Sequence, residues 1–392
     1  MKIVHVCLTS NVFGKHYAYQ DNLLSKAHAK LGHDVSIIAP TYSEFDKNTG
    51  KVISSPVGEE MIDNGIRLIR LRPALPTSTN QHIHMFCGLS KAIYSINPDL
   101  LFIHGVSSLN YRFFKRYKKK HPNVAIVFDS HADFNNSCKN KISYYYTKYI
   151  VKNFVVRKIK NITKIFYGVT PARCEFLHDM YGVPKEKIYL LPMGADDEYM
   201  LFDKKFEIRQ NIRKQYGINN EDFLVVTGGK IDPLKNIHVL AKAVAESKYE
   251  KIKMLIFGSI RDDLKQVFDP LFSNRIQYVG WLPSNEVYKY FYAADVVVFP
   301  GLHSVLWEQA VASKVPCAFS KIKGFEHVDF GGNCVLMEGK TADYYQSLME
   351  RLYIDPEYYN QLLEKSHSKL SNQFLYSFIA QKVLDDIKSE KS

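Results

Sequence analysis

Residues 3–40 read IVHVCLTSNVFGKHYAYQDNLLSKAHAKLGHDVSIIAP and contain two apolar runs separated by an amphipathic segment. The first run, residues 3–8, is continuous, which is typical of a parallel strand covered on both faces. Residues 17–30 predict a helix, and Gly32 can end it in the left-handed conformation. A second apolar strand follows over residues 34–40. This order predicts one right-handed βαβ unit.

The same pattern recurs along the chain, in two sets of short apolar strands. The first set is expected at residues 100–103, 124–128, 165–170 and 188–191, and the second at 223–230, 253–259, 276–280, 296–300 and 317–319. A chain of 392 residues is also too long for one ordinary core. The turn-rich residues 192–196 are the expected hinge.

We therefore expect an α/β protein with two doubly wound, Rossmann-like domains that face each other across a cleft. The first domain is placed at residues 1–195 and the second at 196–370. A helix in residues 371–392 is expected to return to the first domain. Open parallel sheets bind ligands at the carboxyl ends of their strands, so the cleft is the expected ligand site.

Composition excludes several other classes of protein. Hydrophobic residues make up 46% and charged residues 23%, as in folded globular proteins. No run of eighteen apolar residues exists, and the short apolar start lacks a cleavage pattern, so a cytoplasmic protein is expected. The six cysteines lie far apart without metal-ligand spacing, which predicts reduced thiols and neither a disulfide framework nor a zinc site.

Positive charge is concentrated in residues 111–160. This stretch holds thirteen Lys and Arg but only two acids, Asp129 and Asp133, and so carries +11 of the chain's net charge of +12. Tyrosine and phenylalanine rings lie among the basic residues. That mixture is typical of an anionic membrane interface, although a solvated basic face with inward-packed rings is the alternative. No nucleic-acid motif accompanies the charge.

The segment from Gly228 to Asn236, GGKIDPLKN, follows an apolar strand. Its glycines allow close approach of a ligand to the backbone, and Lys230 and Lys235 supply two cations near a helix start. These features suit a diphosphate, although an ordinary strand-to-helix turn remains open. A Walker loop would need a different ending.

Residues 299–310, FPGLHSVLWEQA, leave a buried strand and enter a helix. The backbone amides of Ser304, Val305 and Leu306 are candidates to face a phosphate, and Glu308 is a candidate to accept hydrogen bonds from ribose hydroxyls. The alternative is that Glu308 only complements the helix dipole.

These segments, together with residues 257–259, 278–283 and 293–300 between them, resemble in content and order the carboxyl-terminal domain of family 4 retaining glycosyltransferases of the GT-B fold. Residues 30–35 and 191–196 are similar to recurrent segments of that family's first domain. The resemblance covers most of the chain.

The resemblance implies roles for individual residues. Lys230 and Lys235 would neutralise the donor diphosphate and make a metal unnecessary, while Glu308 would hold the ribose. His131 matches a histidine that faces the donor sugar, and it joins the two lysines in the expected catalytic set. The expected donor-binding set is Gly14, Gly229, Leu282, His303, Ser304, Val305, Leu306 and Glu308.

One position departs from the family. The family's first motif glutamate, which contacts the transferred sugar, would lie eight residues before Glu308, where this chain has Pro300. We expect His303 or Ser304 to take over part of that contact. The missing glutamate leaves the identity of the sugar open and raises the alternative of a nucleotide-binding pseudoenzyme or scaffold on the same fold.

The resulting expectation is a metal-independent retaining glycosyltransferase without a cofactor. Its donor would be a nucleotide sugar, with UDP favoured over GDP, and its acceptor a glycan or lipid-linked molecule of surface polysaccharide biosynthesis. Residues 111–160 would hold it at the inner, anionic face of a membrane, and no nucleic acid is expected to bind. A nucleotide-sugar epimerase or a glycosyl phosphorylase is a further alternative on the same architecture.

Overall fold

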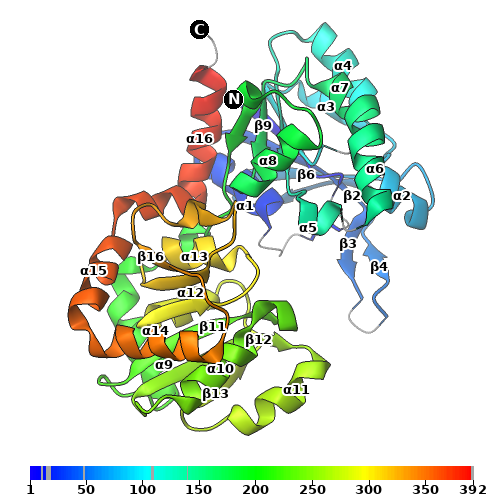
Figure 1. Cartoon of the computed structure of the whole chain (residues 1–392). Coiled ribbons are helices and arrows are strands. Elements are labelled where there is room, and N and C mark those ends of the chain that lie inside the picture. Colours follow the sequence, from blue (N-terminus) through cyan, green and yellow to red (C-terminus); the bar gives the residue numbers. More distant parts are fainter. Residues whose placement is uncertain (10–11, 15–18, 47–48, 107–109, 139, 390–392) are drawn as a thin grey trace. The chain divides into compact units, whose positions relative to one another are not determined.

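The computed structural model of the chain (Figure 1) describes residues 1–9, 12–14, 19–46, 49–106, 110–138 and 140–389. The chain divides into two compact units. The first unit comprises Met1–Pro192 and Tyr376–Ser392, and the second comprises Met193–Leu375. Each unit holds a largely or wholly parallel sheet flanked by helices, so the expected class of two doubly wound α/β domains is confirmed.

Within the described residues, the sheet of the first unit has eight strands in the order β10-β9-β8-β7-β1-β2-β6-β5. All neighbours are parallel except β5 and β6. The strands are β1 Lys2–Val6, β2 Asp34–Pro40, β5 Gly58–Ile62, β6 Ile66–Leu71, β7 Leu100–His104, β8 Ala125–Ser130, β9 Ile165–Gly168 and β10 Ile188–Leu190. A separate hairpin pairs β3 Tyr42–Phe45 with β4 Val52–Ser54.

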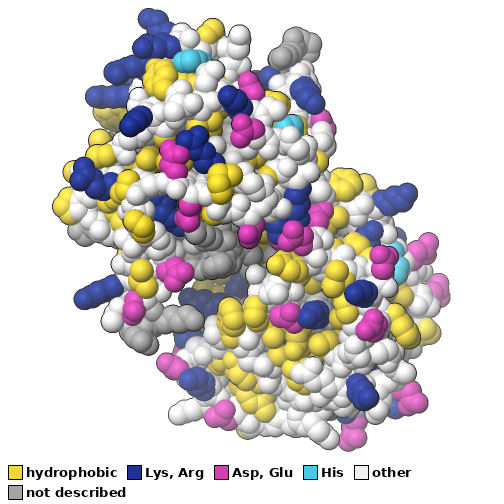
Figure 2. All heavy atoms as spheres, turned by 180° about the vertical axis from the view of Figure 1, so that it is seen from behind, with side chains coloured by type: hydrophobic (Ala, Val, Ile, Leu, Met, Phe, Trp, Pro, Cys, Tyr) yellow, Lys and Arg dark blue, Asp and Glu magenta, His cyan; other side chains and the backbone are white. Residues whose placement is uncertain are grey.

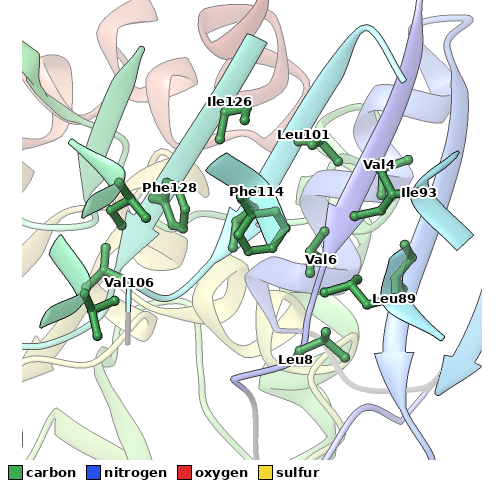
Figure 3. Close-up of a cluster of buried hydrophobic side chains, with 14 of the residues drawn as sticks. Val4, Val6, Leu8, Leu89, Ile93, Leu101, Val106, Phe114, Ile126 and Phe128 are labelled. Atoms are coloured by element: carbon green, nitrogen blue, oxygen red, sulfur yellow. The ribbon is translucent and has the colours of Figure 1, made fainter. Parts of the chain in front are cut away.

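Helices cover both faces of this sheet, which explains the continuous apolar strands. One face packs against α1 (Gln20–Lys30) and the terminal α16 (Tyr376–Ser389), where the Tyr167 hydroxyl donates to Asp386 at 3.1 Å. The other face packs against side chains of α3 (Leu89–Ile96), α4 (Tyr111–Lys120) and α8 (Pro171–Asp179). Figure 3 shows this second cluster, in which Phe114 of α4 lies over Val6, Leu101 and Phe128.

The second unit holds a parallel sheet that has six strands within the described residues, in the order β13-β12-β11-β14-β15-β16. Its strands are β11 Phe223–Ile231, β12 Ile252–Ile260, β13 Ile276–Gly280, β14 Val296–Phe299, β15 Cys317–Ser320 and β16 Cys334–Met337. Its main helices are α9 Lys205–Gln215, α10 Ile237–Glu246, α11 Asp262–Phe268, α12 Val287–Ala293, α13 Leu306–Ala312, α14 Ala342–Ile354 and α15 Pro356–Ser366.

Side chains alternate between the two faces of this sheet. Val298 packs in the cluster that contains α10 and α14, whereas its neighbour Phe299 faces Phe291 of α12 and Phe319 of β15. Trp307 of α13 stacks on Phe319 at a centroid distance of 4.7 Å. The core therefore fixes α13 directly beside the end of β14.

Strands β5, β6 and β16 were not expected from the sequence. Strand β6 reads IRLIRL, and its arginines hide the apolar pattern. Arg70 is nevertheless buried, because its Nη1 donates to the carbonyl oxygens of Phe13 and Pro40, each at 3.1 Å. Its burial depends on partners distant in sequence, which no local pattern reveals.

All six cysteines are free thiols, as expected. No helix among the described residues is both long and apolar enough to cross a membrane.

Glycine is required where β11 and β12 run side by side. Gly229 and Gly258 are register partners, and a Cβ on Gly258 would lie 1.9 Å from the Gly229 carbonyl oxygen. Gly258 also has a φ of +112°. The glycines at this strand end are thus needed for the sheet itself.

We expect Gly258→Ala to lower the free energy of unfolding by about 2–5 kcal/mol, because overpacking adds to the unfavourable φ. Gly217→Ala is the matched control, since Gly217 also has a positive φ but nothing within 4 Å of an added Cβ. It should cost only about 1 kcal/mol. Equal losses in urea unfolding of the two variants would contradict the steric account.

Candidate functional site

Two loops of the second unit meet at the carboxyl edge of its sheet. Strands β11 and β14 are neighbours, and the loop after each one contacts the other. The Leu302 amide donates to the Leu234 carbonyl at 3.1 Å. A Cβ on Gly301 would lie 2.3 Å from both Leu234 O and Lys235 Cα. The absence of a side chain at Gly301 therefore allows the two predicted binding segments to pack together.

Lys235 joins these loops. Its ammonium donates to the carbonyl oxygens of Leu302 at 2.6 Å and of His303 at 3.2 Å. Burial lowers its pKa, and nearby Asp232 opposes that shift. An ammonium has three donors, so one remains for a further acceptor.

Lys230 lies at the end of β11 with an exposed side chain. Among the described residues its ammonium has no hydrogen-bond or ion-pair partner. The preceding residue, Gly229, adopts a φ of +104° and packs beneath Leu306, whose Cδ1 would be 3.0 Å from an added Cβ. The end of β11 therefore lies against the start of α13.

Glu308 is fully buried in α13 between two imidazoles. The Nε2 atoms of His303 and His327 lie 2.8 Å and 2.9 Å from the same oxygen, Oε1. Burial by itself would raise the pKa of Glu308, but the two histidines outweigh burial and lower it to about 2. Its other oxygen, Oε2, is buried and has no hydrogen-bond partner among the described atoms. Oε2 is thus the carboxylate oxygen that no described hydrogen-bond donor satisfies.

The two candidates for the missing sugar contact differ in environment. The His303 side chain is only 4% exposed, because it packs on Trp307 and Phe325 and faces Glu308. Ser304 is partly exposed at the start of the helix, where its carbonyl accepts the Trp307 amide at 3.0 Å. Val305 is the N-cap residue, and its carbonyl accepts the Gln309 amide at 3.0 Å. Of the two candidates, His303 therefore has a buried side chain that is already engaged with Glu308.

His327 was not predicted as a site residue from the sequence. It lies nineteen residues after Glu308 in a short turn without a recognisable motif. Only packing of this turn against α13 reveals its role.

Pro300 continues the end of β14, and its carbonyl accepts a hydrogen bond from the Tyr345 hydroxyl at 3.1 Å. No carboxylate therefore stands at the position of the family's first motif glutamate. Leu282, a member of the expected donor-binding set, is half-buried just after β13, the edge strand.

Gly14 and His131 belong to the first unit, after β1 and β8 respectively. The carbonyl oxygen of the buried Gly14 accepts a hydrogen bond from the side-chain Nδ2 of Asn22 at 3.0 Å. The His131 side chain is 42% exposed, with its Nε2 3.9 Å from Asp129 Oδ2. Both residues follow carboxyl ends of strands, as expected for the binding edge.

A chain of buried polar groups lies behind His131. His104 Nδ1 is 2.6 Å from Asp129 Oδ2, and His104 Nε2 is 3.0 Å from His5 Nδ1. The other ring nitrogen of His5, Nε2, lies 3.0 Å from His28 Nδ1. Burial would raise the pKa of Asp129, but His104 outweighs it and lowers the pKa well below its usual range. Burial lowers the pKa of His28 to about 3. Asp129 is therefore an anion held beside His131.

Within the described residues, one group of side chains has the chemistry to hold a metal ion. The ligand atoms of His303, Glu308 and His327 all lie within 4.8 Å of one another. Two imidazoles and one carboxylate are a common donor set for zinc and iron. The same atoms also form the hydrogen bonds described above, so this group supports both arrangements.

The two doubly wound α/β units of this chain have the GT-B architecture. Residues 22–199 match the family model "Glycosyltransferase Family 4", and residues 208–369 match "Glycosyl transferases group 1". Together these matches support a GT-B glycosyltransferase similar to family 4.

Individual relatives are distant. D-inositol 3-phosphate glycosyltransferase of Pseudarthrobacter chlorophenolicus is 26% identical over 200 residues, which are 48% of this chain and 47% of that protein. The chain spans about half the length of the first curated relatives it matches. Mannosylfructose-phosphate synthase of Agrobacterium fabrum is 19% identical over 92% of this chain and 83% of that protein.

Solved structures share the fold. Anabaena HepE in complex with UDP superimposes with a TM-score of 0.71 at 15% identity, over 99% of this chain and all of that one. Sucrose-phosphate synthase from Thermosynechococcus elongatus gives a TM-score of 0.66 at 15% identity, over 100% and 99% of the two chains.

Proposed function

We propose that this protein transfers a sugar from a nucleotide-sugar donor to a glycan or lipid-linked acceptor, with retention of configuration. UDP-sugars are favoured as donors and GDP-sugars come next. The favoured pathway is surface polysaccharide biosynthesis on the cytoplasmic side of a membrane. HepE, a structural relative, is described in complexes with UDP and UDP-glucose, which supports a uridine donor.

The observation that carries the proposal is that Lys235, in the loop after β11, is hydrogen-bonded to the loop after β14. Its ammonium holds the loop that leads into Glu308, and Lys230, which has no partner among the described residues, lies on the strand that ends beside the same helix. Two cations near one anchored carboxylate suit a nucleoside diphosphate, with the cations on the phosphates and Glu308 on the ribose.

The chemistry proposed for this arrangement needs little covalent work from the protein. The bond between the sugar carbon and the diphosphate oxygen breaks, and Lys230 and Lys235 stabilise the departing anion. The acceptor hydroxyl then attacks the oxocarbenium-like sugar from the same face, and the leaving phosphate takes its proton. His131, beside the Asp129 anion, is proposed to face the donor sugar.

Pro300 favours a second candidate function. A family glutamate that contacts the transferred sugar is absent, so a nucleotide-binding pseudoenzyme or scaffold is the alternative. Release of free nucleotide from a donor distinguishes the two, because a pseudoenzyme binds nucleotide without releasing it from any sugar.

The direct test is thermal unfolding with a panel of UDP, GDP, ADP and their sugars. A matched nucleotide at 100 times its dissociation constant adds about 2.7 kcal/mol to the free energy of unfolding. We expect a UDP compound to give the largest increase in melting temperature. If no nucleotide raises it, the proposal is wrong.

Metal removal tests the proposal that two lysines replace a metal. We expect nucleotide affinity after extensive dialysis against EDTA to change less than about twofold, which is under 0.5 kcal/mol. Weaker binding after dialysis, restored by added zinc, would contradict it. The group His303, Glu308 and His327 would then be the place to look for the ion.

A further inference from the structure

The basic stretch of the first unit contains one long helical segment with two contrasting faces. It begins as α6 (Lys141–Tyr145), continues as a π-helix (Tyr146–Val156) and ends as α7 (Arg157–Ile159). Asn140 caps its start with a reciprocal capping box to Ser143. We call this segment, residues 141–159, the basic-aromatic helix; Figure 1 shows it along the outer edge of its unit.

One face of the basic-aromatic helix packs on the core. Thr147, Val151, Val155, Val156 and Ile159 are buried there. These contacts fix the helix, so its opposite face is a defined surface.

The opposite face is apolar and exposed. Ile142 is 83% exposed and Phe154 is 60% exposed. Tyr145 and Tyr149 stack at a centroid distance of 5.9 Å, so their rings are already aligned in the free protein. The large apolar side chains exposed on this segment are Ile142, Tyr145, Tyr146, Tyr149, Ile150 and Phe154, and polar Asn153 is exposed among them. Six large apolar side chains on one helix face exceed the scattered exposure that is normal for a surface.

Cations accompany these rings, and anions do not. Lys141, Arg157 and Lys158 are exposed, and no acidic residue occurs between Asp133 and Glu175. Figure 2 shows Lys and Arg side chains gathered along the margin of this unit, with hydrophobic side chains between them. The surface therefore combines apolar and positive character.

Helix α4, which carries the other half of the basic stretch, differs in the placement of its aromatic rings. Its Phe114 and Tyr117 are fully buried, and Phe113 is partly buried against the same core. Helix α4 therefore fits the alternative of a basic face with inward-packed rings. It contributes lysines to the surface, while the basic-aromatic helix contributes the exposed rings.

We infer that the basic-aromatic helix inserts its exposed face into an anionic lipid bilayer. Tyrosine and phenylalanine suit the headgroup boundary, and flanking lysines suit anionic lipids. A protein partner is disfavoured because the cores of protein interfaces are depleted in lysine. The inference deepens the proposed function by assigning its membrane contact to one helix face.

Sedimentation of the full-length protein with vesicles tests the inference. Vesicles of phosphatidylcholine with roughly a third phosphatidylglycerol are compared with pure phosphatidylcholine, since each basic residue near an anionic surface adds about 1 kcal/mol. Ile142→Ser/Phe154→Ser removes apolar surface without changing charge. We expect it to lower partitioning onto anionic vesicles more than about tenfold.

Phe206→Ser is the matched control, because Phe206 is 75% exposed on α9 of the second unit. It should bind vesicles like the wild type. The single variant Phe154→Ser guards against misfolding of the double variant, and circular dichroism checks both. Equal binding to neutral and anionic vesicles, or wild-type binding by both variants, would overturn the inference.

Two further readouts separate the remaining explanations. Gel filtration without lipid tests self-association: a wild-type dimer that the double variant loses would show that a second copy covers the face, and would overturn the inference. Nucleotide-induced thermal stabilisation is measured on the same proteins. If vesicle binding holds but no nucleotide stabilises the protein, the proposed function fails while the membrane contact stands.

Discussion

Lys235→Ala is expected to slow release of nucleotide from the donor by about 100- to 1,000-fold. The substitution removes one of two cations that stabilise the leaving diphosphate. It also removes the hydrogen bonds that hold the Leu302 and His303 carbonyls. Free nucleotide released from the best donor in the thermal-shift panel is the measurement.

Two control variants separate the effect of the Lys235 charge from the effect of losing its hydrogen bonds to the loop carbonyls. Lys235→Arg keeps the cation and should retain more activity than Lys235→Ala. Lys242→Ala, at an exposed lysine that pairs with Glu246 on α10, should be neutral. Turnover by Lys235→Ala within about threefold of wild type, less than 1 kcal/mol, would remove Lys235 from the catalytic set.

Removal of both imidazoles from Glu308 is expected to have the largest effect on stability. His303→Phe/His327→Phe leaves a fully buried carboxylate without a donor and should lower the free energy of unfolding by about 3–5 kcal/mol at neutral pH. Urea unfolding of both proteins at a series of pH values measures this loss of stability.

The pH dependence of the free energy of unfolding should also change sign in the double variant. In the wild type the pKa of Glu308 is lowered from an ordinary 4.5 to about 2, so its stabilising contribution is complete above pH 4.5 and is lost as the pH falls towards 2. In the double variant only burial remains, which raises the pKa. Acidification through that raised pKa should therefore stabilise the double variant, because the folded state then binds the proton more tightly.

Glu308→Gln supplies the control for this experiment. In its background the same two histidine substitutions should cost much less, and the pH effect should vanish, because no buried charge remains. A loss of equal size in both backgrounds would mean that the histidines act through packing alone.

Local sequence patterns were sufficient to predict the class of the fold. Strands β2 and β13 lie at the predicted residues, because a parallel strand covered on both faces must be apolar throughout. Strand β6 was missed, because the burial of Arg70 depends on hydrogen bonds to the carbonyl oxygens of Phe13 and Pro40, which are distant in sequence. The binding segments were found through glycines and lysines at strand ends, where sterics and charge leave a local signature.

The sequence by itself determined two doubly wound α/β domains, a lysine-bearing loop after one strand and an acid at the start of a later helix. Only the tertiary structure decided the partners of these groups: His327 beside Glu308, two loop carbonyls on Lys235, and rings that face inward on α4 but outward on the basic-aromatic helix. The physical reason is the distance along the sequence over which each kind of interaction acts. Strand and helix patterns reflect neighbours within one turn or one strand, whereas hydrogen bonds and burial join residues that are distant in sequence and become adjacent only when the chain packs.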